Sequence, residues 1–222
     1  MTWVGLMVRL TDLGFVKGVI FETIVSTYNK DGTPNAAPMG ATMQDPQTIS
    51  LNAYNSSSTS SNLKTNKCGV INLTSNIVFF YKTTFKEANP DGTLPQEWFE
   101  KAEVINAPKL RSADATVAVS VVDTIAVGPE KTKFSCKIER INAAEMSPQV
   151  YCRAKSATLE AIIHATRVKA FINEKTKQKD VRKLLDMIEN SSDIVNRTAP
   201  NSMYSGVISD LMKNIDSWRN KL

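Results

Sequence analysis

A change in hydrophobic periodicity near residue 150 limits the folds open to this 222-residue chain. Before that point apolar residues recur every second position, as in Phe134, Cys136 and Ile138, which is typical of half-buried strands. After it they recur every third and fourth position, as in Leu159, Ile162 and Ile163, which is typical of amphipathic helices. The sequence therefore predicts an α+β protein with a β domain over residues 1–150 and an α-helical domain over residues 151–222.

Six segments of the first part have strand-like composition, and turn residues separate them. The Asp31-Gly32 pair lies between two of these segments and predicts a β-hairpin. We expect strands over residues 19–28, 35–43, 48–54, 69–74, 115–127 and 133–141.

Short helices are expected between these strands, over residues 58–67 and 77–85 and around Trp98 within residues 90–103. Three longer helices are expected in the last part, with Ser191-Ser192 and the segment 199–202 as the breaks between them.

Histidine and cysteine usage excludes several classes of protein. His164 is the only histidine, and the three cysteines are widely spaced with no CxxC pair, so no metal site is predicted. A hydrolase would need His164 as its base, yet this residue falls in a helical stretch where a packed or half-exposed histidine is expected, and we predict no catalytic residue. Cys152 is expected to pack as a small residue.

The chain shows no signal peptide and no apolar run that could span a membrane, so we expect a cytoplasmic protein.

The net charge of +5 resides entirely in the last third of the chain. Residues 1–150 carry 14 basic and 14 acidic side chains, whereas residues 151–222 carry 13 basic and 8 acidic ones. The basic stretch 167–183 suggests either a patch for nucleic acid or a solvated helical surface. Phe171 is its only aromatic residue, so base stacking has little support and the solvated surface is favoured.

Three polar or small-residue segments between residues 22 and 74 are candidates for a ligand site. The segment 34–40 is rich in Pro, Ala and Gly, which weaken a strand and can mark the close approach of a flat ligand. The segment 55–62 is a run of Ser, Thr and Asn before a helix, where hydroxyls and helix amides can bind a phosphate. The strand 69–74 would bring Asn72 beside both. Without a ligand the same segments would be a bulged edge strand, a polar helix cap and a core strand.

Taken together, these segments resemble the FMN-binding split barrel of the flavin-reductase-like proteins. The stretches ETIVSTYNKDGTPNAAPMGA and NLKTNKCGVINLT, followed by YCRAKSATLEAIIHATR, are similar to an uncharacterised, mainly archaeal subfamily with a helical C-terminal part. The resemblance implies a Greek-key split barrel that binds FMN and forms a homodimer with the cofactor near the interface. It also implies that NAD(P)H or another small redox partner meets the flavin.

Carried onto this sequence, the resemblance implies two groups of cofactor-binding residues and one supporting residue. The phosphate and ribityl chain would meet Ser58, Thr59, Ser60, Asn62 and Lys64. The isoalloxazine ring would lie near Thr23, Val25, Asn35, Ala37, Pro38, Met39 and Gly40. Asn72 would be a nearby polar support.

Three functions stay open at this point. The favoured one is a flavoprotein oxidoreductase in which the flavin carries the redox chemistry. The second is a module that stores or delivers flavin without catalysis. The third, least favoured because the barrel part is neutral, is a nucleic-acid binder that uses the basic helical tail.

Overall fold

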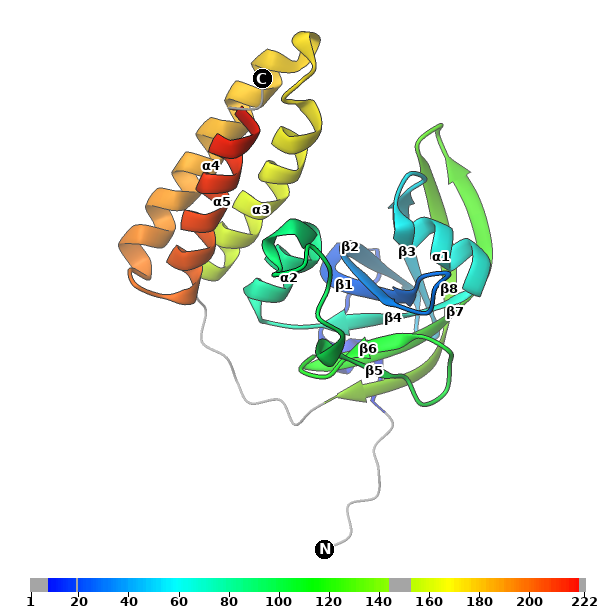
Figure 1. Ribbon diagram of the computed structural model, residues 1–222. Helices are drawn as coiled ribbons and strands as arrows, with labels where there is room; N and C mark the ends of the chain where they lie inside the picture. Colours follow the sequence, from blue (N-terminus) through cyan, green and yellow to red (C-terminus); the bar gives the residue numbers. More distant parts are fainter. Residues whose placement is uncertain (1–7, 19, 144–152, 220–222) are drawn as a thin grey trace, which may run out of the picture. The chain divides into compact units, whose positions relative to one another are not determined.

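The computed structural model describes residues 8–18, 20–143 and 153–219. The chain forms two compact units, one of residues 1–75 and 85–147 and the other of residues 76–84 and 148–222 (Figure 1). We call them the barrel unit and the helical unit. The predicted division between residues 150 and 151 falls outside the described residues.

The barrel unit is built on a closed antiparallel barrel with the strand order β1-β2-β3-β8-β7-β4. Its strands agree closely with the six segments expected from the sequence, and the predicted α+β split-barrel class with a helical C-terminal part is confirmed. The strands are β1 (Ile20–Tyr28), β2 (Pro34–Asp45), β3 (Thr48–Tyr54), β4 (Cys68–Leu73), β7 (Ala115–Val127) and β8 (Lys131–Ala143).

The β1–β2 hairpin forms where the Asp-Gly pair predicted it. Gly32 has φ +82°, a conformation that side chains with a Cβ rarely adopt. Asp31 fixes the turn further, because its Oδ1 accepts hydrogen bonds from the Thr33 amide at 3.0 Å and from the Thr33 hydroxyl at 2.6 Å. The turn sets the register of the hairpin, in which Val25 pairs with Ala37.

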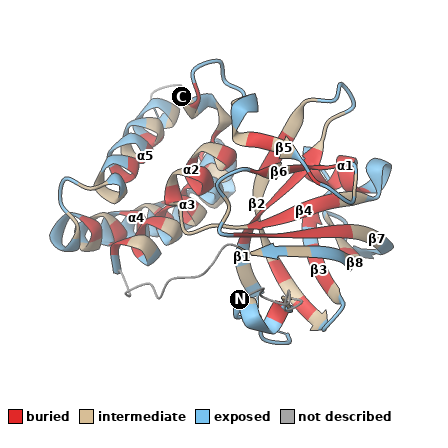
Figure 2. Ribbon diagram, turned by 90° about the horizontal axis from the view of Figure 1, so that it is seen from below, coloured by how far each residue is buried: buried red, intermediate tan, exposed pale blue. Residues whose placement is uncertain are grey.

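Alternating apolar residues of the strands fill the barrel. Helix α1 (Ser58–Asn66) adds Leu63 to this core, and the 3₁₀ turn η1 (Leu10–Leu13) adds Leu10. Figure 2 shows buried residues along the strands, whereas the second half of β7, residues 123–127, is exposed. The buried core residues include Val25, Ala41, Ile49, Leu51, Ile71, Val117, Val119 and Phe134.

A two-stranded sheet of β5 (Phe99–Lys101) and β6 (Pro108–Leu110) contacts β1 and β4. Ser26 Oγ donates to Pro108 O at 2.6 Å, and Asn72 Oδ1 accepts the Leu110 amide at 2.8 Å. The sequence predicted a short helix around Trp98 within residues 90–103. The 3₁₀ turn η3 (Gln96–Trp98) forms there, but strand β5, which the sequence did not predict, begins at Phe99. Before this sheet, the chain forms the 3₁₀ turn η2 (Lys86–Ala88), which follows α2 in sequence.

The helical unit contains α2 (Ile77–Thr84), α3 (Arg153–Phe171), α4 (Gln178–Thr198) and α5 (Met203–Arg219), with the short η4 (Lys175–Lys177) before α4. Helices α3, α4 and α5 confirm the three predicted amphipathic helices. Helix α2 packs against α3 and α5, and Asn214 Nδ2 donates to the Tyr81 hydroxyl at 2.8 Å. The predicted break at Ser191-Ser192 was wrong, because Ser191 is buried within α4 and bonds the Met187 carbonyl.

Candidate functional site

The predicted cofactor-binding residues fall into a buried group and a more accessible group. Ser58 and Lys64 are exposed. Intermediate exposure is shared by Ala37, Pro38, Met39 and Gly40. The buried ones are Thr23, Val25, Asn35, Thr59, Ser60, Asn62 and Asn72.

Strand alternation divides the residues predicted to lie beside the isoalloxazine ring. Antiparallel partners share a face of the sheet, and Val25 with Ala37 and Thr23 with Met39 are such pairs. Because Val25 belongs to the barrel core, these four side chains face the interior. The Thr23 hydroxyl donates to Met39 O at 2.8 Å and thereby ties β1 to β2.

Pro38 and Gly40 lie on the opposite, outer face of β2, where they pair with Ile24 and Glu22. A Cβ built on Gly40 would lie 2.6 Å from Ile20 Cγ2, so the glycine lets the exposed Ile20 side chain rest against the strand. The Ile20 side chain therefore occupies the space beside Gly40, and a planar ring on the outer face of β2 would meet Pro38 and Ile20 there.

The start of α1 carries the groups suited to a phosphate. Ser57 is the N-cap, and its hydroxyl accepts the Ser60 amide at 3.1 Å. Ser58 begins the helix with an exposed side chain, and the exposed Lys64 donates to Asn55 Oδ1 at 3.2 Å. A helix N-terminus with free hydroxyls and a nearby ammonium group is a favourable place for an anion.

A buried hydrogen-bond network supports this helix from below. Asn35 Nδ2 donates to Thr59 Oγ1 at 3.1 Å and to Thr27 Oγ1 at 3.3 Å. Asn62 Nδ2 donates to Thr27 Oγ1 and to Asn29 Oδ1, both at 3.0 Å. The network joins β1, β2 and α1, so Asn35, Thr59 and Asn62 hold the helix in place.

Ser60 is the exception among these buried groups. It is 0% exposed, and its hydroxyl has no hydrogen-bond partner within the described part of the chain. A buried hydroxyl normally finds a partner. Its place in the first turn of α1 leaves it able to serve a group bound at the helix start.

Asn72 forms hydrogen bonds with both of its side-chain polar atoms. Its Nδ2 donates to Ile24 O and Ser26 Oγ, both at 2.9 Å, while Oδ1 accepts the Leu110 amide. These bonds link β4 to β1 and β6. Asn72 therefore connects three strands, and this role is structural.

Sequence reasoning missed Lys86. This lysine is the first residue of the 3₁₀ turn η2, and its Nζ lies 2.6 Å from Asn35 Oδ1 across 51 positions of sequence. Burial lowers the pKa of Lys86 below its ordinary value. No local pattern marks such a residue, because its environment arises only from the fold.

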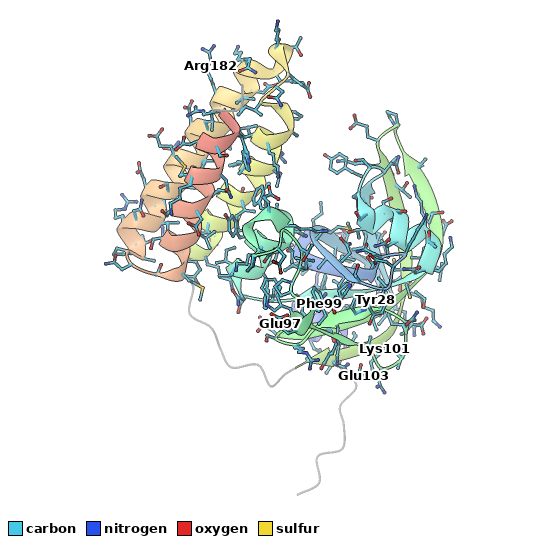
Figure 3. All side chains as sticks on the ribbon, viewed as in Figure 1. Tyr28, Glu97, Phe99, Lys101, Glu103 and Arg182 are labelled. Atoms are coloured by element: carbon cyan, nitrogen blue, oxygen red, sulfur yellow. The ribbon has the colours of Figure 1, made fainter. Side chains whose placement is uncertain are left out.

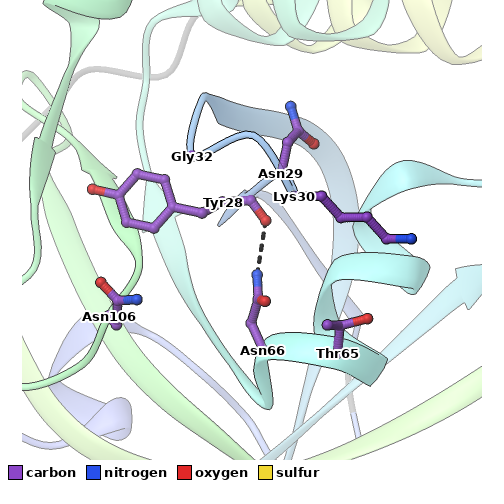
Figure 4. A pocket seen from close by; sticks show the side chains of 7 residues that line it. All are labelled: Tyr28, Asn29, Lys30, Gly32, Thr65, Asn66 and Asn106. Atoms are coloured by element: carbon purple, nitrogen blue, oxygen red, sulfur yellow. Dashed lines mark hydrogen bonds between the residues drawn. The ribbon is translucent and has the colours of Figure 1, made fainter.

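A hollow of about 570 Å³ lies on one side of the β1–β2 turn (Figure 4). Asn66 Nδ2 donates to the Tyr28 carbonyl at 2.8 Å across its floor, and the Tyr28 ring extends toward Asn106. The lining is rich in amide side chains and contains none of the predicted cofactor-binding residues; it consists of Tyr28, Asn29, Lys30, Gly32, Thr65, Asn66 and Asn106.

Other polar features of the chain contribute no residue to the predicted site. Within residues 8–18, 20–143 and 153–219, no group of His, Cys, Asp and Glu side chains could hold a metal ion. His164 is buried in α3, as the sequence indicated, and Cys152 lies outside the described residues. Arg182, in the basic stretch, is exposed on α4 (Figure 3). No helix in the described ranges is long and apolar enough to cross a membrane.

The closed six-stranded barrel and the C-terminal helices define a flavin-reductase-like split-barrel fold with a helical C-terminal part. A family model described as "Protein of unknown function (DUF447) N-terminal domain" matches residues 21–145, and "Protein of unknown function (DUF447)" matches residues 152–203. The chain belongs to the DUF447 family. No curated protein matches it.

Two solved structures illustrate the likeness. An FMN-bound DUF447 protein from Methanosarcina mazei is 23% identical, with a TM-score of 0.76 over 93% of this chain and 99% of that one. Nitrilotriacetate monooxygenase component B from Bacillus cereus is 18% identical, with a TM-score of 0.50 over 66% of this chain and 82% of that one. Both likenesses concern the fold.

Proposed function

We propose that this protein is a flavoprotein that binds FMN. The observation that carries the proposal is membership of the DUF447 family, to which the FMN-bound protein from Methanosarcina mazei also belongs. The likeness between the two folds spans nearly the whole length of both chains.

The accessible members of the predicted site fit the chemistry of FMN. Ser58, the first-turn amides of α1 and Lys64 would hold the phosphate, and the orphaned Ser60 hydroxyl lies in the same turn. Pro38 and the Ile20 side chain beside Gly40 would contact the ring, and the backbone of β2 would offer groups for its polar edge. The buried network of Asn35, Thr59 and Asn62 would act indirectly by fixing α1.

The favoured activity is that of an oxidoreductase. Bound flavin would supply the redox chemistry, while the protein positions it and excludes water. This requires no acid or base at the site, which suits a chain with one histidine, located in α3 of the helical unit. NAD(P)H is the proposed electron donor.

A module that stores or delivers flavin without catalysis is the alternative. Stopped-flow reduction by NADH and NADPH separates the two. Reduction of bound flavin faster than that of free FMN by either donor supports the enzyme. If both donors reduce bound flavin no faster than they reduce free FMN, the result supports the storage module.

The cofactor is tested by an absorbance spectrum of the purified protein, with chromatography of any flavin released by heat. FMN is the expected compound. A colourless protein that also fails to bind added FMN would overturn the proposal.

The phosphate position is tested by comparing FMN with riboflavin, which lacks the phosphate. We predict that Ser58→Ala combined with Lys64→Met weakens FMN binding by about tenfold, or ~1.4 kcal/mol, and leaves riboflavin binding unchanged. Ser61→Ala, at an exposed position of the same helix, is the matched control. Equal losses for both flavins, or none, would contradict this phosphate site.

Assembly and location also remain proposals. We propose a homodimer with FMN near the subunit interface, which light scattering after gel filtration would check, and a cytoplasmic location. A nucleic-acid role is disfavoured. It would require binding that falls steeply between low and moderate salt.

A further inference from the structure

The β1–β2 turn borders a second cavity, on the side where Lys86 lies. Its volume is about 410 Å³, within the range of sites for small molecules. The turn and the segment 92–96 form most of its wall. The lining residues are Asn29, Asp31, Thr33, Pro34, Lys86, Gly92, Thr93, Leu94 and Gln96.

The fold fixes the backbone of Lys86 at this wall. Phe85, directly before it, is only 1% exposed and anchors the segment. Directly after it, the Asn89 side chain and amide both donate to the Lys86 carbonyl at 3.0 Å. Lys86 is therefore held at both sides rather than carried on a loose loop.

The charge of Lys86 is not balanced by a carboxylate. Within the described part of the chain its ammonium forms no ion pair, and its hydrogen-bond partner is the neutral Asn35 amide oxygen. An ammonium group has three N–H donors. A partly buried cation with donors to spare beside a cavity is suited to an incoming anion, since a charge removed from water needs a partner.

The other residues that line the cavity indicate which kind of anion it could bind. Asp31 lies on the lining, and its bonds to Thr33 lower the pKa of its carboxyl, so it is ionised at neutral pH. A second negative charge disfavours a dianion such as phosphate. Leu94 is buried, and together with Pro34 it offers an apolar surface.

We propose that this cavity binds a small organic monocarboxylate with an apolar body, whose carboxylate pairs with the Lys86 ammonium while its body rests on Pro34 and Leu94. The inference does not rest on the bound flavin: the cavity lining contains none of the residues assigned to FMN, and the two sites meet only where Lys86 bonds Asn35. Asn35 would act as a positioning residue that fixes the ammonium.

Benzoate is the probe, with the neutral benzamide of the same shape and inorganic phosphate as comparisons. Amide NMR shifts of the flavin-saturated protein would report binding, and flavin fluorescence would report any release of FMN. We expect benzoate to shift the amides of residues 31–33, 86, 92–94 and 96, and to bind at least tenfold more tightly than benzamide or phosphate. Binding should weaken as the pH rises and Lys86 loses its proton.

Lys86→Met should weaken benzoate binding at least tenfold. Lys101→Met, at the exposed end of β5 (Figure 3), should leave it unchanged. Thr93→Trp narrows the cavity while keeping the cation and should also abolish binding, which guards against a folding defect in the lysine variant. Unchanged binding in Lys86→Met, equal binding of benzamide or phosphate, or release of FMN by benzoate would each overturn the proposal.

Discussion

Asparagine residues form much of the polar framework inside the barrel unit. Asn35, Asn62 and Asn72 are all at most 7% exposed, and each connects different elements. An amide side chain both donates and accepts, so it can join two backbone or side-chain groups that face each other. The same property makes these residues costly to replace, because their partners would be left buried without a bond.

Asn72→Ala illustrates that cost. It leaves the Leu110 amide without its partner and removes the bond that the Ser26 hydroxyl accepts, and we predict a loss of about 3 kcal/mol in the free energy of unfolding. Denaturant unfolding would measure it. Asn52→Ala, at an exposed position of β3, is the control and should change stability by less than about 0.5 kcal/mol. If both substitutions changed the free energy of unfolding by a similar amount, Asn72 would not have the structural role described above.

Single residues also show where prediction from sequence ends. The Ser/Thr run and the small residues of β2 indicated a ligand-binding region from local composition alone. Composition did not reveal that Ala37 and Met39 face the interior while Pro38 and Gly40 face outward. That division depends on the register of β1 with β2 and on which face the core occupies. Lys86 escaped notice for a related reason, since its partner Asn35 is remote in sequence.

At the scale of elements, α1 depends on its cap and its contacts more than on its own composition. The helix has nine residues, and Leu63 is its only large apolar side chain in the barrel core. Isolated helices of that length are marginal in water. The Ser57 hydroxyl therefore matters, because it satisfies a first-turn amide and also donates to Tyr54 O at 2.7 Å.

Ser57→Ala should lower the free energy of unfolding by about 1 kcal/mol. Ser61→Ala, an exposed position inside the same helix, should be neutral or slightly stabilising because alanine favours helices. Thermal and denaturant melts of both variants would check this. Equal stability of the two variants would show that the cap contributes nothing.

Elements in which apolar residues recur with a clear period could be predicted from the sequence, and those without such a period could not. The barrel strands are long enough to show alternation, and the Asp-Gly turn marked their first hairpin. Strands β5 and β6 have three residues each, too few to reveal a period. They form because Asn72 and Ser26 supply bonding partners from far along the chain. Ser191-Ser192 misled because serine often ends a helix, yet here Ser191 bonds the preceding turn.

At the scale of the whole molecule, the two units should respond differently to acid. His164 is 7% exposed in α3, and its Nδ1 has no partner within the described ranges. Burial lowers the pKa of His164, Glu160 opposes that shift, and Arg167 adds to it. The unfolded chain, with an ordinary histidine pKa of about 6.5, then binds the proton more readily than the folded chain. Stability present above pH ~6.5 is lost as the pH falls through the folded pKa.

Hydrogen exchange of peptides at pH 7.5 and pH 5.5, corrected for intrinsic rates, would test this. We predict that protection of α3 falls at the lower pH. His164→Leu should remove that histidine-dependent loss, and the barrel strands serve as an internal reference. An equal loss in wild type and variant would assign the acid sensitivity to other groups.

The membership of α2 in the helical unit has a consequence for how such proteins could have evolved. The chain leaves the barrel unit after Ser75 and returns to it at Phe85. In the gene, the codons for α2 therefore lie between codons for the barrel unit, although α2 belongs to the helical unit. A recombination event that exchanged only the 3′ part of the gene would leave α2, with its buried residues Ile77, Phe80 and Tyr81, without the helices α3 and α5 against which it packs. We therefore expect the barrel and the helices to be inherited as a pair rather than exchanged separately among genes.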